Sequence, residues 1–162
     1  MGKYQVDEYT VSLLHFDDGV KDETGKEWTI NGAATVSAAK SKFGTSALYI
    51  DSNGSSISML SPLANLYKSP YTIELWFYPT SFAGGVGDQY GVLVGFTGFN
   101  DTYTGGAIRL CKIANSNRIP GMVTTNQSLA SSDLVTLNSW HHVALTFDGT
   151  VSRFFKWKIT KY

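Results

Sequence analysis

The sequence is poor in cysteine and in charge, and these shortages exclude several classes of protein. Cys111 is the single cysteine among 162 residues, so the chain has no internal disulfide and that residue alone cannot build a zinc site. Only 16% of the residues are charged, and the 13 basic residues balance the 13 acidic ones. Lysine and arginine form no long run, so the sequence predicts no nucleic-acid partner and no anionic membrane partner.

Long apolar runs are also missing from the sequence. No stretch approaches the ~18 apolar residues of a membrane-spanning helix. The first residues, Met1–Glu8, are polar and lack the apolar segment of a secretion signal. We therefore expect the protein to be intracellular, released by lysis, or part of a longer exported chain.

Aromatic residues, by contrast, are abundant and make up 14% of the chain. A chain of 162 residues is long enough to bury a core of its own, so we expect a single domain over residues 1–162. Residues 1–9 are interpreted as an N-terminal extension. The formal net charge of zero gives little self-repulsion and favours association with further copies or other partners.

Apolar residues recur with a period of two, and turn-forming residues separate the periodic segments, which is typical of β-strands. The sequence predicts strands at Thr10–Phe16, Glu27–Asn31, Ala34–Ser37, Ala47–Ile50, Ser56–Met59, Tyr71–Tyr78, Gly91–Phe96, Ala107–Ile113, Gly121–Thr124, Trp140–Phe147 and Val151–Lys158. Asp148-Gly149-Thr150 predicts a hairpin turn between the last two. Leu60–Lys68 predicts at most one helical turn. Many short strands with turns between them favour an all-β sandwich or jelly roll.

Several segments resemble a known family in their order and spacing. They are Leu13–Gly19, Asp22–Gly25, Ala38–Leu48, Tyr71–Pro79 and Trp140–Thr150. Together they resemble the laminin-G-like branch of the concanavalin A-like lectin/glucanase superfamily, and the opening segments are especially similar to copies in bacteriophage tail and virion proteins. The resemblance implies two antiparallel sheets stacked face to face as a jelly-roll sandwich.

The C-terminal end departs from that family. The resemblance implies further strands after the predicted hairpin, whereas residues 151–162 form one atypical strand. We therefore expect a jelly roll that is shortened at its C-terminus: a truncated chain, an abridged fold, or a fold completed by another chain. Phe154, Phe155 and Trp157 predict either an ordinary edge strand protected by lysines or a strand that docks on a neighbouring subunit.

Individual residues of the predicted strands carry further expectations. In Tyr71–Tyr78 both faces bear large apolar groups, which predicts a central strand in a sheet covered on both sides. His141 and His142 are adjacent, so their side chains point to opposite faces and cannot both bind one ion; we expect them to pack and to form hydrogen bonds. Gly44 is expected to adopt a backbone conformation that residues with a Cβ disfavour.

Patterns for catalysis are missing, and we expect no enzymatic activity. Glycoside hydrolysis usually needs two carboxylates ~5–10 Å apart, and for the hydrolase branch the resemblance implies an E-x-D-x-x-E or E-x-D-x-E strand that this sequence lacks. Glu74 is interpreted as a structural or solvent-facing glutamate. Cys111 is interpreted as a strand thiol, and no G-x-S-x-G nucleophile turn occurs.

Calcium is the one cofactor for which the sequence offers candidate ligands. The resemblance implies such a site, because laminin-G-like and legume-type relatives often bind Ca²⁺ through loop Asp and Asn side chains and backbone carbonyls. The candidate ligands are Asp17, Asp18 and Asp22, with further clusters at Asp51/Asn53 and Asn100/Asp101. Turn formation alone also explains aspartate and asparagine in such positions, so both interpretations stay open.

The segment Thr80–Gly106 is the candidate ligand-binding loop. Its candidate binding residues are Phe82, Tyr90, Phe99, Asn100, Asp101 and Tyr103. Loops on a rigid β scaffold often carry function, and a tyrosine offers an apolar body with a polar end. The alternative is a connection whose aromatic residues pack back onto the sheet.

Three hypotheses of function follow. The first is a non-enzymatic binding and assembly module that contacts carbohydrate or a protein surface, as a decoration or tail-associated part of a phage virion or on the bacterial cell surface. The second is an accessory or catalytic module of a glycan-active enzyme. The third is a purely structural subunit, in a homo-oligomer or among other virion subunits, whose jelly roll neighbouring chains complete.

Overall fold

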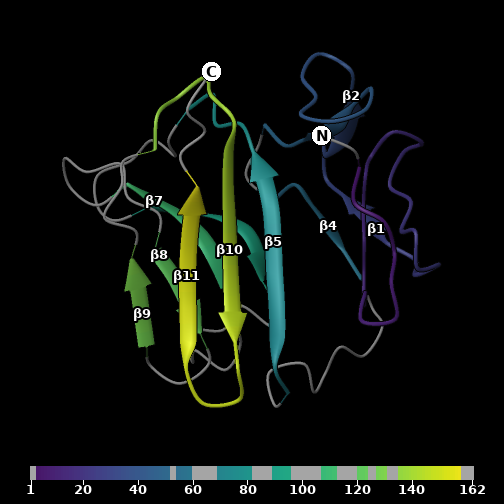
Figure 1. Ribbon diagram of the computed structural model, residues 1–162. Coiled ribbons are helices and arrows are strands. Elements are labelled where there is room, and N and C mark those ends of the chain that lie inside the picture. Colours follow the sequence, from purple (N-terminus) through teal and green to yellow (C-terminus); the bar gives the residue numbers. More distant parts are fainter. Residues whose placement is uncertain are drawn as a thin grey trace, which may run out of the picture. The chain divides into compact units, whose positions relative to one another are not determined.

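The described part of the computed structural model consists of β-strands and the loops between them (Figure 1). The residues that it describes are 3–51, 54–59, 69–81, 89–95, 107–112, 120–123, 127–130 and 135–157. Every regular element in these ranges is a strand, which confirms the predicted all-β class. A helix with the length and apolarity to cross a membrane does not occur in these ranges.

The strands agree closely with those expected from the period of two. They are β1 Thr29–Asn31, β2 Thr35–Ser37, β3 Ala47–Tyr49, β4 Ser56–Ser58, β5 Tyr71–Phe77, β6 Gln89–Gly95, β7 Ala107–Lys112, β8 Pro120–Val123, β9 Gln127–Ala130, β10 His141–Phe147 and β11 Ser152–Trp157. Strand β9 was not expected from the sequence. The helical turn expected at Leu60–Lys68 lies outside the described residues.

The chain divides into two compact units, Met1–Pro62 and Leu63–Tyr162. In the first unit, hereafter unit 1, β1 pairs with β4 and β2 pairs with β3, both antiparallel. Each of these strands has three residues. Such short two-stranded sheets are marginally stable alone, so unit 1 needs other interactions to hold its loops. The single domain over residues 1–162 stays a prediction.

Residues 10–16 of unit 1 do not form the expected strand, and that prediction is wrong. The segment makes an isolated antiparallel bridge between Leu14 and Asp22. The Leu13 amide donates to the Asp22 carboxylate at 3.2 Å, and the φ of Phe16 is 65°. A left-handed φ is rare for a bulky residue and interrupts extended backbone. The side chain of Asp22 therefore competes successfully with strand pairing here.

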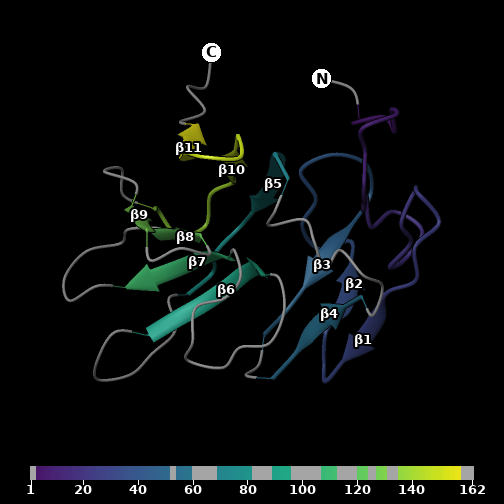
Figure 2. The same cartoon turned by 90° about the horizontal axis from the view of Figure 1, so that it is seen from below.

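The second unit, hereafter unit 2, contains two antiparallel sheets. One has the strand order β11-β10-β5 and the other has the order β6-β7-β8-β9, with a register shift in β6 between Val92 and Val94. Figure 2 shows the two sheets as separate layers. Among the described strands of this sheet β10 is central and β5 lies beside it, and the expectation of a central strand at Tyr71–Tyr78 stays a prediction.

The core of unit 2 lies on one face of the β11-β10-β5 sheet. Its buried cluster is Tyr71, Phe77, Val135, Val143 and Leu145. Leu93 and Val94 of β6 pack against this cluster, so the two sheets stack face to face. All-β composition and stacked antiparallel sheets are what a concanavalin A-like sandwich requires. The C-terminal shortening stays a prediction.

The turn between β10 and β11 forms as the sequence predicts. Both strands pair antiparallel, from His142 opposite Trp157 to Phe147 opposite Ser152. Asp148 accepts hydrogen bonds from the amides of Thr150 at 3.0 Å and Val151 at 2.8 Å, and Gly149 has a φ of 98°. An aspartate that binds its own turn, followed by a glycine with positive φ, fixes a tight connection.

Candidate functional site

The β11-β10-β5 sheet has a second face, opposite to its core face. Alternation along the strands turns every second side chain away from the buried cluster. The residues turned away, hereafter the outer face, are Thr72, Glu74 and Trp76 of β5, His142, Ala144 and Thr146 of β10, and Arg153 and Phe155 of β11. Aromatic and ionisable side chains are thus gathered on this face.

Trp76, His142 and Glu74 form a contact group in the outer face. The register places His142 directly opposite Trp76, and their ring centroids lie 4.8 Å apart. His142 Nε2 lies 3.4 Å from Glu74 Oε2. Burial lowers the pKa of His142, although the nearby Glu74 opposes this shift. His142 is therefore uncharged at neutral pH, and it supports Trp76 and Glu74 from the buried central strand.

The exposed part of the outer face lies on the two flanking strands. Ala144 is 3% exposed, so neighbouring side chains close over it. In contrast, the Glu74 side chain is 40% exposed, and so is Phe155. Trp76 is half-buried. The accessible surface therefore combines one carboxylate with aromatic rings on either side of a buried strand.

A second aromatic pair follows at the end of the same strands. Tyr78 comes directly after β5 and Trp140 directly before β10, and their rings meet edge to face at 5.4 Å. Both side chains are half-buried. Asn138, with a φ of 57°, donates its amide to the Pro79 carbonyl at 2.8 Å and thereby ties this loop to the end of β5.

The two adjacent histidines point to opposite faces, as predicted. His141 lies on the core face, where its ring stacks on Phe77 at 5.3 Å and its Nε2 lies 2.8 Å from the Thr136 carbonyl oxygen. Burial lowers the pKa of His141. Each histidine packs against an aromatic ring of β5, which confirms their expected role in packing and hydrogen bonding.

Asp22, a candidate calcium ligand, is instead the centre of a hydrogen-bond network. The residue is 4% exposed. Its Oδ2 accepts from Ser12 Oγ at 2.5 Å and Trp28 Nε1 at 3.0 Å. Its Oδ1 accepts from the Leu13 amide and from the amide and hydroxyl of Thr24, at 3.2, 2.8 and 2.7 Å. Burial opposes ionisation of Asp22, but these donors hold its pKa well below the usual range.

The other two candidate calcium ligands are placed differently from Asp22. Asp17 pairs with Lys3 and accepts from the amide and hydroxyl of Thr45, at 2.6 and 3.0 Å. The hydrogen bonds of Asp17, above all the one from Lys3, lower its pKa. Asp18 is exposed. No group of three or more His, Cys, Asp or Glu side chains in the described ranges could hold a metal ion, and calcium stays a prediction.

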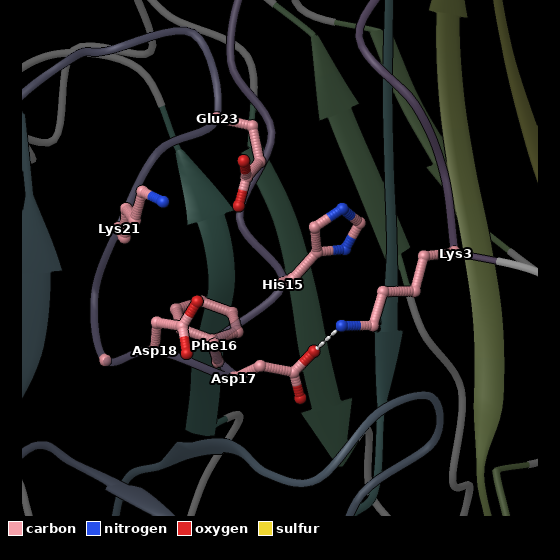
Figure 3. Close-up of a pocket in the computed structure, with 8 residues that line it drawn as sticks. Lys3, His15, Phe16, Asp17, Asp18, Lys21 and Glu23 are labelled. Carbon is pink, nitrogen blue, oxygen red and sulfur yellow. Dashed lines mark ion pairs between the residues drawn. The ribbon is translucent and has the colours of Figure 1, made fainter.

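Figure 3 shows the hollow around Asp17 and Asp18, with Lys3 reaching toward Asp17. Its volume is about 30 Å³, which is room for about two water molecules. The lining residues are Lys3, His15, Phe16, Asp17, Asp18, Gly19, Lys21 and Glu23. Charges of both signs line it, and it is too small for a sugar ring. We therefore assign it a structural role around the Lys3–Asp17 ion pair.

Most of the candidate binding loop Thr80–Gly106 lies outside the described residues, so its position relative to the outer face is not described. Phe82, Phe99, Asn100, Asp101 and Tyr103 lie outside the described residues. Tyr90 belongs to β6, where its register partner is Cys111. The binding role of these residues stays a prediction.

The sequence contained a signal for the outer face that was interpreted differently. In Tyr71–Tyr78 the alternation already separates Glu74, Trp76 and Tyr78 from Ile73, Leu75 and Phe77. Large apolar groups on both faces of this segment also predict a covered strand. Aromatic residues that follow one another on a strand face, as Trp76 and Tyr78 do, are also enriched at binding surfaces.

Comparison with known proteins gives one family. A laminin-G-type family model, described as the concanavalin A-like lectin/glucanases superfamily, matches residues 51–156. The matched range includes strands β4 to β11, and hence the whole β11-β10-β5 sheet apart from the last residue of β11. No curated protein and no solved structure gives a match. A domain of this family fits a carbohydrate-binding or structural module.

Proposed function

The chain belongs to the concanavalin A-like lectin/glucanases superfamily, and from this membership we propose that it is a non-enzymatic module that binds carbohydrate through the outer face. The observation that carries the proposal is the group formed by Trp76, His142 and Glu74, with Phe155 exposed on the other flank. Binding sites typically combine aromatic side chains with a few fixed polar groups.

The chemistry of this group suits a sugar. The C–H face of a pyranose ring is apolar and packs on an aromatic ring, while its hydroxyls need hydrogen-bond partners. Trp76 offers the aromatic surface, and the Glu74 carboxylate accepts hydrogen bonds from hydroxyls. His142 is 7% exposed and contacts both residues. Both are thus held in place before the ligand arrives, which lowers the entropic cost of binding.

The same face supports a binding role more than a catalytic one. Glycoside hydrolysis usually needs two carboxylates ~5–10 Å apart across the scissile bond. Among the outer-face residues Glu74 is the sole carboxylate. The nearest acidic residue along β10 and β11 is Asp148, which already binds Arg153 and two amides of its turn.

Substitution of Trp76 tests the proposal. We expect Trp76→Ala to weaken binding of neutral oligosaccharides, measured by titration calorimetry after a glycan screen, by about fivefold, because a stacking contact contributes roughly 1 kcal/mol. Tyr9→Ala removes an exposed aromatic ring of unit 1 and should leave affinity unchanged. Circular dichroism checks that each variant is folded. Wild-type affinity in Trp76→Ala would contradict the proposal.

We further propose that the module works in an assembly, as a decoration or tail-associated part of a phage virion or on the bacterial cell surface. The similarity of Leu13–Gly19 and Ala38–Leu48 to virion copies and the zero net charge support this role. Light scattering after size exclusion tests it. We expect a homo-oligomer or stable association with other subunits, and a monomer at every concentration would argue for an independent binding module.

A further inference from the structure

Building on the proposed function, we infer that the outer face prefers glycans that carry a cationic amino group to neutral ones, and rejects carboxylated glycans. The structural basis is the combination of an exposed carboxylate and a tryptophan on one face of β5. Glu74 and Trp76 are two residues apart. Their side chains therefore leave the same face about 6.7 Å apart along the strand.

The charge of the outer face is the first argument. Its ionisable residues are Glu74, His142 and Arg153. Arg153 Nη1 donates to Asp148 Oδ2 at 2.7 Å, so its positive charge is balanced within the hairpin. His142 is uncharged at neutral pH because burial lowers its pKa. Among the described residues of the outer face, Glu74 is thus the unbalanced charge, and this part of the face is negative.

The geometry of Glu74 and Trp76 is the second argument. An ammonium group is attracted to the face of an indole ring within about 6 Å of its centre, and its charge is attracted to a carboxylate even where the nitrogen carries no hydrogen. A sugar ring stacked on Trp76 can direct an amino substituent along the strand toward Glu74. One cationic substituent would then use both interactions. A carboxylate in the same position would meet the like charge of Glu74.

The apolar surroundings of Glu74 strengthen this selectivity. Ala144, the register partner of Glu74, is buried, and Phe155 lies opposite Ala144 on β11. Trp76 follows Glu74 on the same face of β5. A charge interaction is stronger beside apolar groups than in open water. This arrangement suits a ligand charge that arrives from outside.

The decisive experiment compares three oligosaccharides of equal length at neutral pH by titration calorimetry. They are a trimethylated glucosamine oligomer, whose positive charge does not depend on pH, an N-acetylglucosamine oligomer, and a galacturonate oligomer. We expect the cationic oligomer to bind about tenfold more tightly than the acetylated one and the galacturonate oligomer to bind most weakly. The preference should shrink with added salt, because salt screens an exposed charge.

Glu74→Gln separates the inference from the proposed function. The variant should lose the preference for the cationic oligomer over the acetylated one, because the amide that replaces the carboxylate carries no charge. Glu8→Gln, a matched change at an exposed position of unit 1, should keep the preference. Equal binding of all three oligomers, or tighter binding of galacturonate, would overturn the inference alone. Absence of binding to any of them would overturn the proposed function as well.

Discussion

Different interactions stabilise the two units of the chain. In unit 2 the described core consists of large apolar side chains between stacked sheets, including Tyr71, Phe77, Val143 and Leu145. In unit 1 Ala34 is the sole hydrophobic residue among the described positions that is fully buried, and the other buried residues are Asp22 and Ser46. Hydrogen-bonded carboxylates thus stabilise unit 1, whereas apolar packing stabilises unit 2.

Strand length accompanies this difference. The strands β5 and β10 of unit 2 have seven residues each and share a register of seven residue pairs. The strands of unit 1 have three residues each, and long loops run between them. Where few strand hydrogen bonds are available, side chains such as Asp22 satisfy the loop amides instead. Unit 2 should therefore be sensitive to lost volume, and unit 1 to lost charge.

Removal of core volume in unit 2 should have the largest effect. Leu145 is 0% exposed and lies between Ile73 of β5 and Phe154 of β11 in the sheet register. Leu145→Ala should lower the free energy of unfolding by about 4 kcal/mol, because transfer energy is lost and a cavity remains. Urea denaturation measures the change. Leu137→Ala, the same substitution at an exposed site, should cost less than about 0.5 kcal/mol.

Removal of charge in unit 1 should have the next largest effect. Five donors converge on the two carboxylate oxygens of Asp22. Asp22→Asn replaces one of these acceptor oxygens by an NH₂ group, which is itself a donor. We expect a loss of about 3 kcal/mol, because buried donors are left without an acceptor. Amide hydrogen exchange should rise most in residues 12–28. Asp18→Asn, at an exposed position of the same loop, should change stability little, and an equal loss in both variants would refute the network.

Acidification should affect the two units in different pH windows. The pKa values of His141 and His142 in unit 2 are lowered by burial, so their contribution to stability begins to fall as the pH drops below about 6.5, the unfolded value. The pKa values of Asp17 and Asp22 in unit 1 are lowered by hydrogen bonds.

The stability that the carboxylates of unit 1 contribute is fully present above about pH 4. It is lost as the pH falls toward the pKa values that these groups have in the folded protein. Protection from hydrogen exchange, expressed relative to the intrinsic exchange rate at each pH, should therefore fall first around β10 of unit 2 and only below about pH 4 around Asp22. The reverse order would contradict the assigned causes of these shifts.

The sequence predicted unit 2 better than unit 1, and the reason is physical. In β5 the residues of the core face are more buried than those of the outer face, so the alternation is visible in the residue pattern. The turn at Asp148 is local and depends on neighbouring residues only. In unit 1, Asp22 was interpreted as a turn residue or a calcium ligand. Its hydrogen-bond network depends on donors from Ser12 to Trp28, which no local pattern connects.

The candidate site shows the same limit. The sequence predicts which residues of one strand share a face, because side chains alternate along a strand. The register that places Trp76 opposite His142 depends on how two distant strands meet, and it could not be predicted. Strand β9 was missed because Gln127–Ala130 has little apolar alternation.

A glycine in unit 1 offers the smallest and most specific effect. Gly44 has a φ of 67°, and a Cβ there would lie 2.2 Å from Asp17 Oδ1. Gly44→Ala should therefore cost about 2 kcal/mol, from the left-handed backbone and from displacement of the carboxylate. Gly19→Ala is the matched control, since Gly19 also has a positive φ, 86°, but nothing lies within 4 Å of its added Cβ. That change should cost about 1 kcal/mol.

A double-mutant cycle assigns the excess cost of Gly44→Ala to its cause. In an Asp17→Ala background the overlapping carboxylate is gone, so Gly44→Ala should cost no more than Gly19→Ala does. If the cost in that background stays at about 2 kcal/mol, the backbone conformation alone explains it. The contact between the Asp17 carboxylate and the Gly44 loop would then contribute little to stability. In that case the dependence of unit 1 on carboxylates would reduce to Asp22.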